Sequence, residues 1–150
     1  MSVKVRFVDP AKNYNMIKEE IDAAYFDVMS KGDLVCRGQL KSFEENLAKF
    51  VGTKYAVGLN SGYDALHISL RAAGIGDGDE VIVPAHTFVA TCSAVANVGA
   101  IPVLVDVLPD FNINPDELEK AITPRTRAVI PVHLNGYMAD MVALMEIAEK

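Results

Sequence analysis

A short polar turn, Asn60-Ser61-Gly62, separates an apolar run from a helix-forming segment and has the residue types of an anion site. Ser61 can cap the helix that follows, and Gly62 lets a ligand approach the backbone closely. The free amides of a first helical turn face outward with the positive end of the helix dipole behind them, which favours a phosphate. The alternative is structural, with Ser61 as a cap and Gly62 as a turn residue. The turn has neither the GxGxxG nor the Walker pattern.

Aromatic and imidazole side chains follow the later apolar runs. Phe88 comes soon after the run 81–83, where it could lie over a flat ligand, although a core position is the structural alternative. His86 could act as a base, but we favour a surface or hydrogen-bonded histidine. His133 follows the run 128–132, at the edge where such sheets bind ligands, and we assign it no role.

Acidic residues near the apolar runs show no metal-binding pattern. Asp77, Asp79 and Glu80 cluster in a glycine-rich turn, and we interpret them as part of a solvated loop. Asp106 ends the run 101–105 and is either functional or a cap of the following turn.

Short apolar runs alternate with helix-forming segments from residue 54 onward, and these elements must position the residues above. The runs begin at residues 55, 81, 101 and 128, which is the spacing of β-α units. They are apolar throughout, as in strands that helices cover on both faces. Helices are expected over 61–73 and 87–98, from Asn114, which with Glu117 resembles a capping box, and from about residue 138. The pattern predicts an α/β fold with a parallel, doubly wound sheet.

The first 52 residues form a separate helical segment in this prediction. One helix is expected over 13–30, and a second, ending at Gly52, carries apolar residues on one face. The chain ends inside a helical pattern without a stop signal, so we expect it to be shorter than its natural domain.

Composition excludes several functional classes. The 150 residues carry a formal net charge of −6 with no basic cluster, so no nucleic-acid partner is expected. Cys36 and Cys92 are isolated, and neither a disulfide framework nor a zinc site is predicted. No apolar run is long enough to cross a membrane, and no signal core opens the chain, so we expect a cytoplasmic protein without membrane contact.

Five sequence blocks together carry a family resemblance. They are NSGxDAL at 60–66, GDGDEVIVP at 76–84, TFVAT at 87–91, GAxPVxVDV at 99–107 and AITPRTRAVIPVHL at 121–134. In this order and at these distances they resemble the N-terminal part of the DegT-type sugar aminotransferases, fold-type-I enzymes that depend on pyridoxal phosphate (PLP). The resemblance implies that residues 53–150 are the first part of a PLP-binding large domain, incomplete at residue 150, with a mixed, mainly parallel sheet and helices on both faces.

The resemblance also implies roles for individual residues. The backbone amides of Gly62, Tyr63 and Asp64 would hold the PLP phosphate, and Phe88 would stack on the pyridine ring. The family's usual threonine is Tyr63 here, so a hydroxyl contact to the phosphate is lost or replaced by a more distant phenol. No catalytic residue is assigned within the chain, because the Schiff-base lysine and the aspartate that pairs with the pyridine nitrogen are expected beyond residue 150.

The implied function is the transfer of an amino group from an amino acid, usually glutamate, to a nucleotide-linked keto sugar. The implied enzyme is a homodimer that serves polysaccharide biosynthesis, and the chain alone is expected to be inactive. One alternative is a PLP-dependent dehydratase-like relative with histidine in place of the lysine. Another is a non-catalytic fragment that binds or associates with a partner. A dinucleotide-binding domain is disfavoured because the glycine fingerprint is missing.

Overall fold

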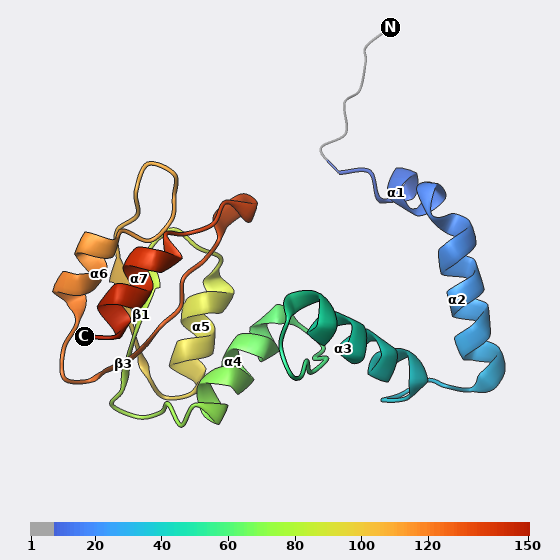
Figure 1. Ribbon diagram of the computed structural model, residues 1–150, viewed down its shortest axis with the longest axis horizontal. Helices are drawn as coiled ribbons and strands as arrows, with labels where there is room; N and C mark the ends of the chain where they lie inside the picture. The colour runs from blue at the N-terminus through green and yellow to red at the C-terminus, as the bar shows by residue number, and fades with distance from the viewer. Residues whose placement is uncertain (1–7) are drawn as a thin grey trace, which may run out of the picture. The chain divides into compact units, whose positions relative to one another are not determined.

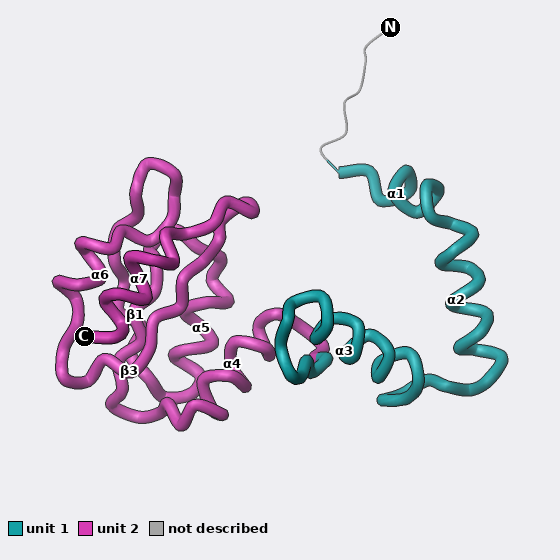
Figure 2. The backbone as a smooth tube through the Cα atoms, in the orientation of Figure 1, with its two compact units in different colours: residues 1–58 teal, residues 59–150 magenta. Residues whose placement is uncertain are grey.

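The structure is a computed structural model that describes residues 8–150. Residues 1–7 of the predicted N-terminal segment therefore lie outside the described part. The chain divides into two compact units, residues 1–58 and 59–150, which Figure 2 shows in different colours. No helix among the described residues is long and apolar enough to cross a membrane.

The first unit contains the helices α1 (Pro10–Met16), α2 (Lys18–Lys31) and α3 (Gly38–Val51) (Figure 1). The helix predicted over 13–30 is thus divided at Ile17, whose backbone leaves the helical conformation (φ −126°, ψ 20°). The predicted end of α3 at Gly52 is confirmed, and α2 ends at Lys31, one residue beyond the expected range, with Gly32 as its cap. Both glycines have positive φ, 63° at Gly32 and 80° at Gly52.

The strand predicted at residues 55–59 is absent, and that prediction was wrong. A strand exists only through hydrogen bonds to a neighbouring strand, and among the described residues this segment has no such neighbour. The backbone N–H of Gly58 instead donates to the Glu44 carboxylate on α3, with a nitrogen–oxygen distance of 2.7 Å.

The other three predicted strands form one parallel sheet in the second unit, although the last one, expected over 128–132, spans Thr126–Val129 instead. The strands are β1 (Glu80–Pro84), β2 (Ile101–Val105) and β3 (Thr126–Val129), in the order β2-β1-β3. All five residues of the central strand β1 are buried, which explains its uninterrupted apolar run. The α/β class with a parallel sheet is therefore confirmed.

Helices cover both faces of this sheet. They are α4 (Gly62–Ala72), α5 (Val89–Asn97), α6 (Pro115–Ala121) and α7 (Met141–Ala148), with a short 3-10 helix, η1 (Leu134–Gly136), before α7. Val81 and Val83 pack with residues of α4 and α5, whereas Ile82 packs with residues of α6 and α7. Successive strand residues point to opposite faces, so one buried strand anchors two cores.

Local capping differs in detail from the sequence prediction. Asn114 caps α6 by accepting the Asp116 N–H at 3.0 Å, but Glu117 completes no capping box and pairs with Lys120 at 2.8 Å. The last helix starts at Met141 rather than near residue 138, because η1 precedes it and Asp140 provides its cap.

The interpretation of Glu80 as part of a solvated loop is wrong. Glu80 is 4% exposed and lies at the amino end of β1. A hydrogen bond from the Thr123 hydroxyl and an ion pair with Arg125 hold the pKa of the Glu80 carboxyl below its usual value, against the opposing effect of burial. These contacts join β1 to the turn before β3, at the edge opposite the predicted ligand site.

Candidate anion-binding site

The predicted helix cap at Ser61 is confirmed. Ser61 has an extended backbone (φ −155°, ψ 158°), and its hydroxyl oxygen accepts the backbone N–H of Asp64 at 3.1 Å. The Ser61 carbonyl accepts the N–H of Ala65, which starts the helical hydrogen bonding of α4. We call residues 61–64 the α4 turn.

Two backbone amides of the α4 turn make no hydrogen bond within the described residues. Within residues 8–150, the N–H groups of Gly62 and Tyr63 have no hydrogen-bond partner. A side chain built on Gly62 would meet no atom within 4 Å, so the space beside these amides is open. The positive end of the helix dipole of α4 lies behind both groups. The turn therefore has the hydrogen-bond donors, the open space and the positive electrostatic field that favour binding of a phosphate group.

The third predicted amide, that of Asp64, is already used by the cap. The Ser61 hydroxyl also donates to the Asp64 carboxylate at 2.9 Å, so Ser61 and Asp64 are joined by two hydrogen bonds. A carboxylate in the first turn stabilises a helix through the dipole, yet it repels an incoming anion. The structure thus offers an anion two free amides rather than three.

The side chain of Tyr63 is directed to another helix. Its phenol oxygen accepts a hydrogen bond from the amide of Asn97, the last residue of α5. Its ring stacks on that of His67, with 5.9 Å between the ring centres. The role of Asn97 has no local signal in the sequence, because the two partners are 34 positions apart.

Phe88 lies at the carboxyl edge of the sheet, just before α5. Its side chain is 76% exposed, which excludes the core position considered from the sequence. His86 is also exposed, and its ring lies 5.1 Å from that of Phe111, in the loop after β2. No hydrogen bond or ring contact within residues 8–150 joins Phe88 to the α4 turn.

The loops after β2 and β3 have structural anchors. His133 is exposed, and its Nδ1 atom accepts the N–H of Ala139 at 3.1 Å. In the neutral ring the proton then lies on Nε2, so His133 presents a donor at this edge. The carboxylate of Asp106 accepts the N–H of Val107 at 2.8 Å, a hydrogen bond within its own turn.

Asn112 is a buried residue that the sequence analysis missed. It is 2% exposed, and its side-chain amide can donate to the Val132 carbonyl at 2.9 Å. It therefore links the loop after β2 to the segment after β3. Asp110 accepts the Asn112 N–H at 3.0 Å and forms a turn with it. This turn-forming aspartate was the only local sequence feature that could have pointed to Asn112.

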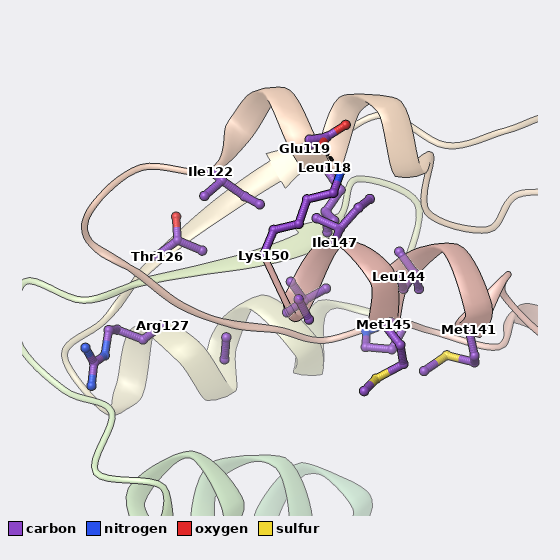
Figure 3. A pocket seen from close by; sticks show the side chains of 14 residues that line it. Leu118, Glu119, Ile122, Thr126, Arg127, Met141, Leu144, Met145, Ile147 and Lys150 are labelled. Carbon is purple, nitrogen blue, oxygen red and sulfur yellow. Dashed lines mark hydrogen bonds and ion pairs between the residues drawn. The ribbon is translucent and has the colours of Figure 1, made fainter.

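A groove of about 630 Å³ lies on the other face, between β3, α6 and α7 (Figure 3). Its walls are mainly apolar, with Leu118, Met141 and Leu144 among them, and an ion pair between Glu119 and Lys150 crosses its rim at 2.6 Å. None of the predicted site residues lines this groove, so the α4 turn is the better candidate for chemistry.

Sequence comparison shows the family to which the chain belongs. The model of the DegT/DnrJ/EryC1/StrS aminotransferase family matches residues 15–150. A dTDP-3-amino-3,4,6-trideoxy-alpha-D-glucose transaminase of Streptomyces venezuelae is 47% identical, over 98% of this chain and 39% of its own length. A UDP-2-acetamido-2-deoxy-3-oxo-D-glucuronate aminotransferase of Pseudomonas aeruginosa is 45% identical, over 97% of this chain and 41% of its own length.

Solved structures agree with this result. DesV of S. venezuelae superposes with a TM-score of 0.96 at 47% identity, and the match covers 99% of this chain and 40% of DesV. NtdA of Bacillus subtilis, solved with bound cofactor PMP, superposes with a TM-score of 0.94 at 38% identity, over 99% of this chain and 35% of NtdA. The chain thus spans about two fifths of the length of the curated relatives it matches.

Proposed function

The chain belongs to the DegT/DnrJ/EryC1/StrS aminotransferase family, and from this premise we propose that its protein uses PLP to transfer an amino group, with glutamate as donor, to a nucleotide-linked keto sugar. The observation that carries the proposal is the pair of free amides at Gly62 and Tyr63, which lies within the family match. In this proposal residues 53–150 are the first part of the PLP-binding large domain.

The residues at the α4 turn fit the phosphate of PLP. The amides of Gly62 and Tyr63 would hold the phosphate, and Gly62 leaves the room for it. Asp64 would add a third amide when the Ser61 hydroxyl turns away. Phe88, exposed at the carboxyl edge, would lie against the pyridine ring. When bound, PLP supplies the electron sink that the amino-group transfer needs.

The lysines of the second unit do not fit the role of the Schiff-base residue. Only Lys120 and Lys150 occur after residue 58, and both are exposed. Hydrogen bonds from their ammonium groups to Glu117 and Glu119 raise the pKa of each lysine, whereas a nucleophilic lysine needs a lowered pKa. Neither Lys120 nor Lys150 is therefore proposed as the Schiff-base residue. Because the chain spans about two fifths of the length of its relatives, we propose that the Schiff-base lysine and the aspartate partner of the pyridine nitrogen lie beyond residue 150, and that the chain alone is inactive.

The test uses the protein expressed from its complete reading frame. It is incubated with PLP, glutamate and a panel of nucleotide-linked keto sugars, and mass spectrometry follows 2-oxoglutarate and the amino sugar. We expect both products from the complete protein and neither from the 150-residue chain. Product formed by the 150-residue chain would refute the placement of the lysine, and a complete protein that binds no PLP would refute the proposed function.

Borohydride reduction separates the transaminase from the dehydratase-like alternative. A lysine-based enzyme is labelled covalently by PLP after reduction, and we expect the labelled peptide to lie outside residues 1–150. A protein that binds PLP but gains no label would have the histidine of the alternative. A protein that is never labelled and never binds PLP would correspond to the non-catalytic fragment.

We also propose that the protein is a cytoplasmic homodimer. The first unit supports self-association because Ala48 is its only buried residue among those described, whereas Phe26, Phe43 and Phe50 are exposed. Apolar surface of this extent favours a protein partner. Light scattering on the complete protein tests the dimer, cell fractionation tests the location, and a monodisperse monomer would contradict the proposed assembly.

A further inference from the structure

Tyr63 connects the beginning of one helix to the end of another. It is the second residue of α4, and its phenol oxygen accepts the hydrogen bond from Asn97, the last residue of α5. Its half-buried ring packs against the core cluster that includes Leu70 and Val95. The side chain therefore joins the first turn of α4 to the layer that covers the sheet.

A second contact fixes the direction of the ring. Tyr63 stacks on His67, one turn further along α4, with an angle of 27° between the ring planes. The Nε2 atom of His67 is buried and has no hydrogen-bond partner in the described part of the chain. The Tyr63 side chain thus has Asn97 as a partner at its tip and His67 along its ring face.

The backbone of Tyr63 carries one of the two free amides of the α4 turn. First turns of helices are the positions that fray, because they lack part of the intrahelical hydrogen bonding. A side chain anchored to a neighbouring helix resists this fraying and keeps the amides in one direction. Preorganised donors bind an anion more tightly than mobile ones, since less ordering occurs on binding.

We propose that Tyr63 is a positioning residue: tethered to Asn97, its side chain holds the α4 turn in the orientation in which the amides of Gly62 and Tyr63 bind a phosphate ester. The inference rests on the proposed binding of PLP at this turn. It assigns the phenol no contact with the phosphate, so the phenol acts through the backbone alone.

The experiment compares PLP with pyridoxal, which lacks the phosphate, on the complete protein. Both compounds are titrated into the apoprotein and followed by absorbance, for the wild type, Tyr63→Phe, Asn97→Ala and the double variant. Tyr14→Phe is the matched control, because it removes a phenol hydrogen bond to Asp22 (2.7 Å) in the first unit. Thermal unfolding of each variant confirms that the fold is kept.

We expect Tyr63→Phe and Asn97→Ala each to weaken PLP binding by about three- to tenfold, the equivalent of one neutral hydrogen bond. Pyridoxal binding should not change, and the double variant should lose no more than either single variant. A purely structural role would instead change both affinities together or neither.

The outcomes separate this inference from the proposed function. A wild type that prefers PLP, with variants that keep the full preference, would overturn the positioning role of Tyr63 and leave the phosphate site in place. Additive losses in the double variant would also overturn it, because the two side chains would then act independently. A wild type without any preference for PLP over pyridoxal would overturn the phosphate site itself.

Discussion

Replacing Gly62 by alanine should stabilise the fold and weaken cofactor binding at the same time. The backbone of Gly62 does not adopt the left-handed conformation that requires glycine, and an added Cβ atom would meet nothing within 4 Å. The fold itself therefore gives no reason for glycine at this position, whereas the close approach of a phosphate does.

The two effects can be estimated separately. Alanine at a compatible position lowers the conformational entropy of the unfolded chain and raises the free energy of unfolding by about 0.4–1 kcal/mol. The same methyl group occupies the open space beside the free amides. Forcing one methyl into a close contact costs about 1–3 kcal/mol, which corresponds to a loss of PLP affinity of about 5- to 150-fold.

The assay measures both quantities on the complete protein. Urea unfolding gives the free energy of unfolding, and absorbance titration of the apoprotein gives the PLP affinity. Gly76→Ala is the matched control, because Gly76 also has a compatible backbone and its Cβ atom would lie 3.7 Å from the nearest atom, the Val98 carbonyl oxygen. This variant should gain similar stability and bind PLP like the wild type.

Two results would refute the reasoning. A Gly62→Ala protein that binds PLP with wild-type affinity would show that the phosphate does not approach the backbone at this position. A Gly62→Ala protein that is less stable than the wild type would show that the described conformation of the α4 turn is wrong.

Three further predictions concern the core, the acid stability and the aromatic face. Leu118→Ala should lower the free energy of unfolding by about 2–5 kcal/mol in urea, because Leu118 is 1% exposed, and unchanged stability would refute its core role. The fold lowers the pKa of the Glu80 carboxyl, so the ionised carboxylate stabilises the fold above its usual pKa of 4.5, and this stabilisation is lost as the pH falls below that value. Urea midpoints measured across this pH range should fall in the wild type and fall less in Glu80→Gln. Phe88→Ala should change the free energy of unfolding by less than about 0.5 kcal/mol, because the ring is exposed. It should weaken PLP binding by about two- to tenfold, and an unchanged absorbance titration with PLP would exclude stacking.

The sequence determined the local features of this protein. The spacing of apolar runs predicted where β1, β2 and β3 lie. Burial on both faces explains the apolar run of the central strand β1, whereas β2 and β3 are only partly buried. Ser61 and Asn114 predicted the starts of α4 and α6. A helix cap is a hydrogen bond between residues only two or three positions apart, so the local sequence specifies it. The free amides of the α4 turn follow from the same local geometry.

The tertiary structure alone decided which distant residues meet. The segment 55–59 has the composition of a strand but forms none, because strand formation depends on a hydrogen-bonding neighbour. Glu80 follows an acidic turn in the sequence, yet it is the buried first residue of β1, and its partner Arg125 lies 45 positions away. Tyr63 likewise meets Asn97 only because α4 packs against α5. Periodicity and capping act over a few residues, whereas these contacts arise from the packing of whole elements, and no local pattern encodes them.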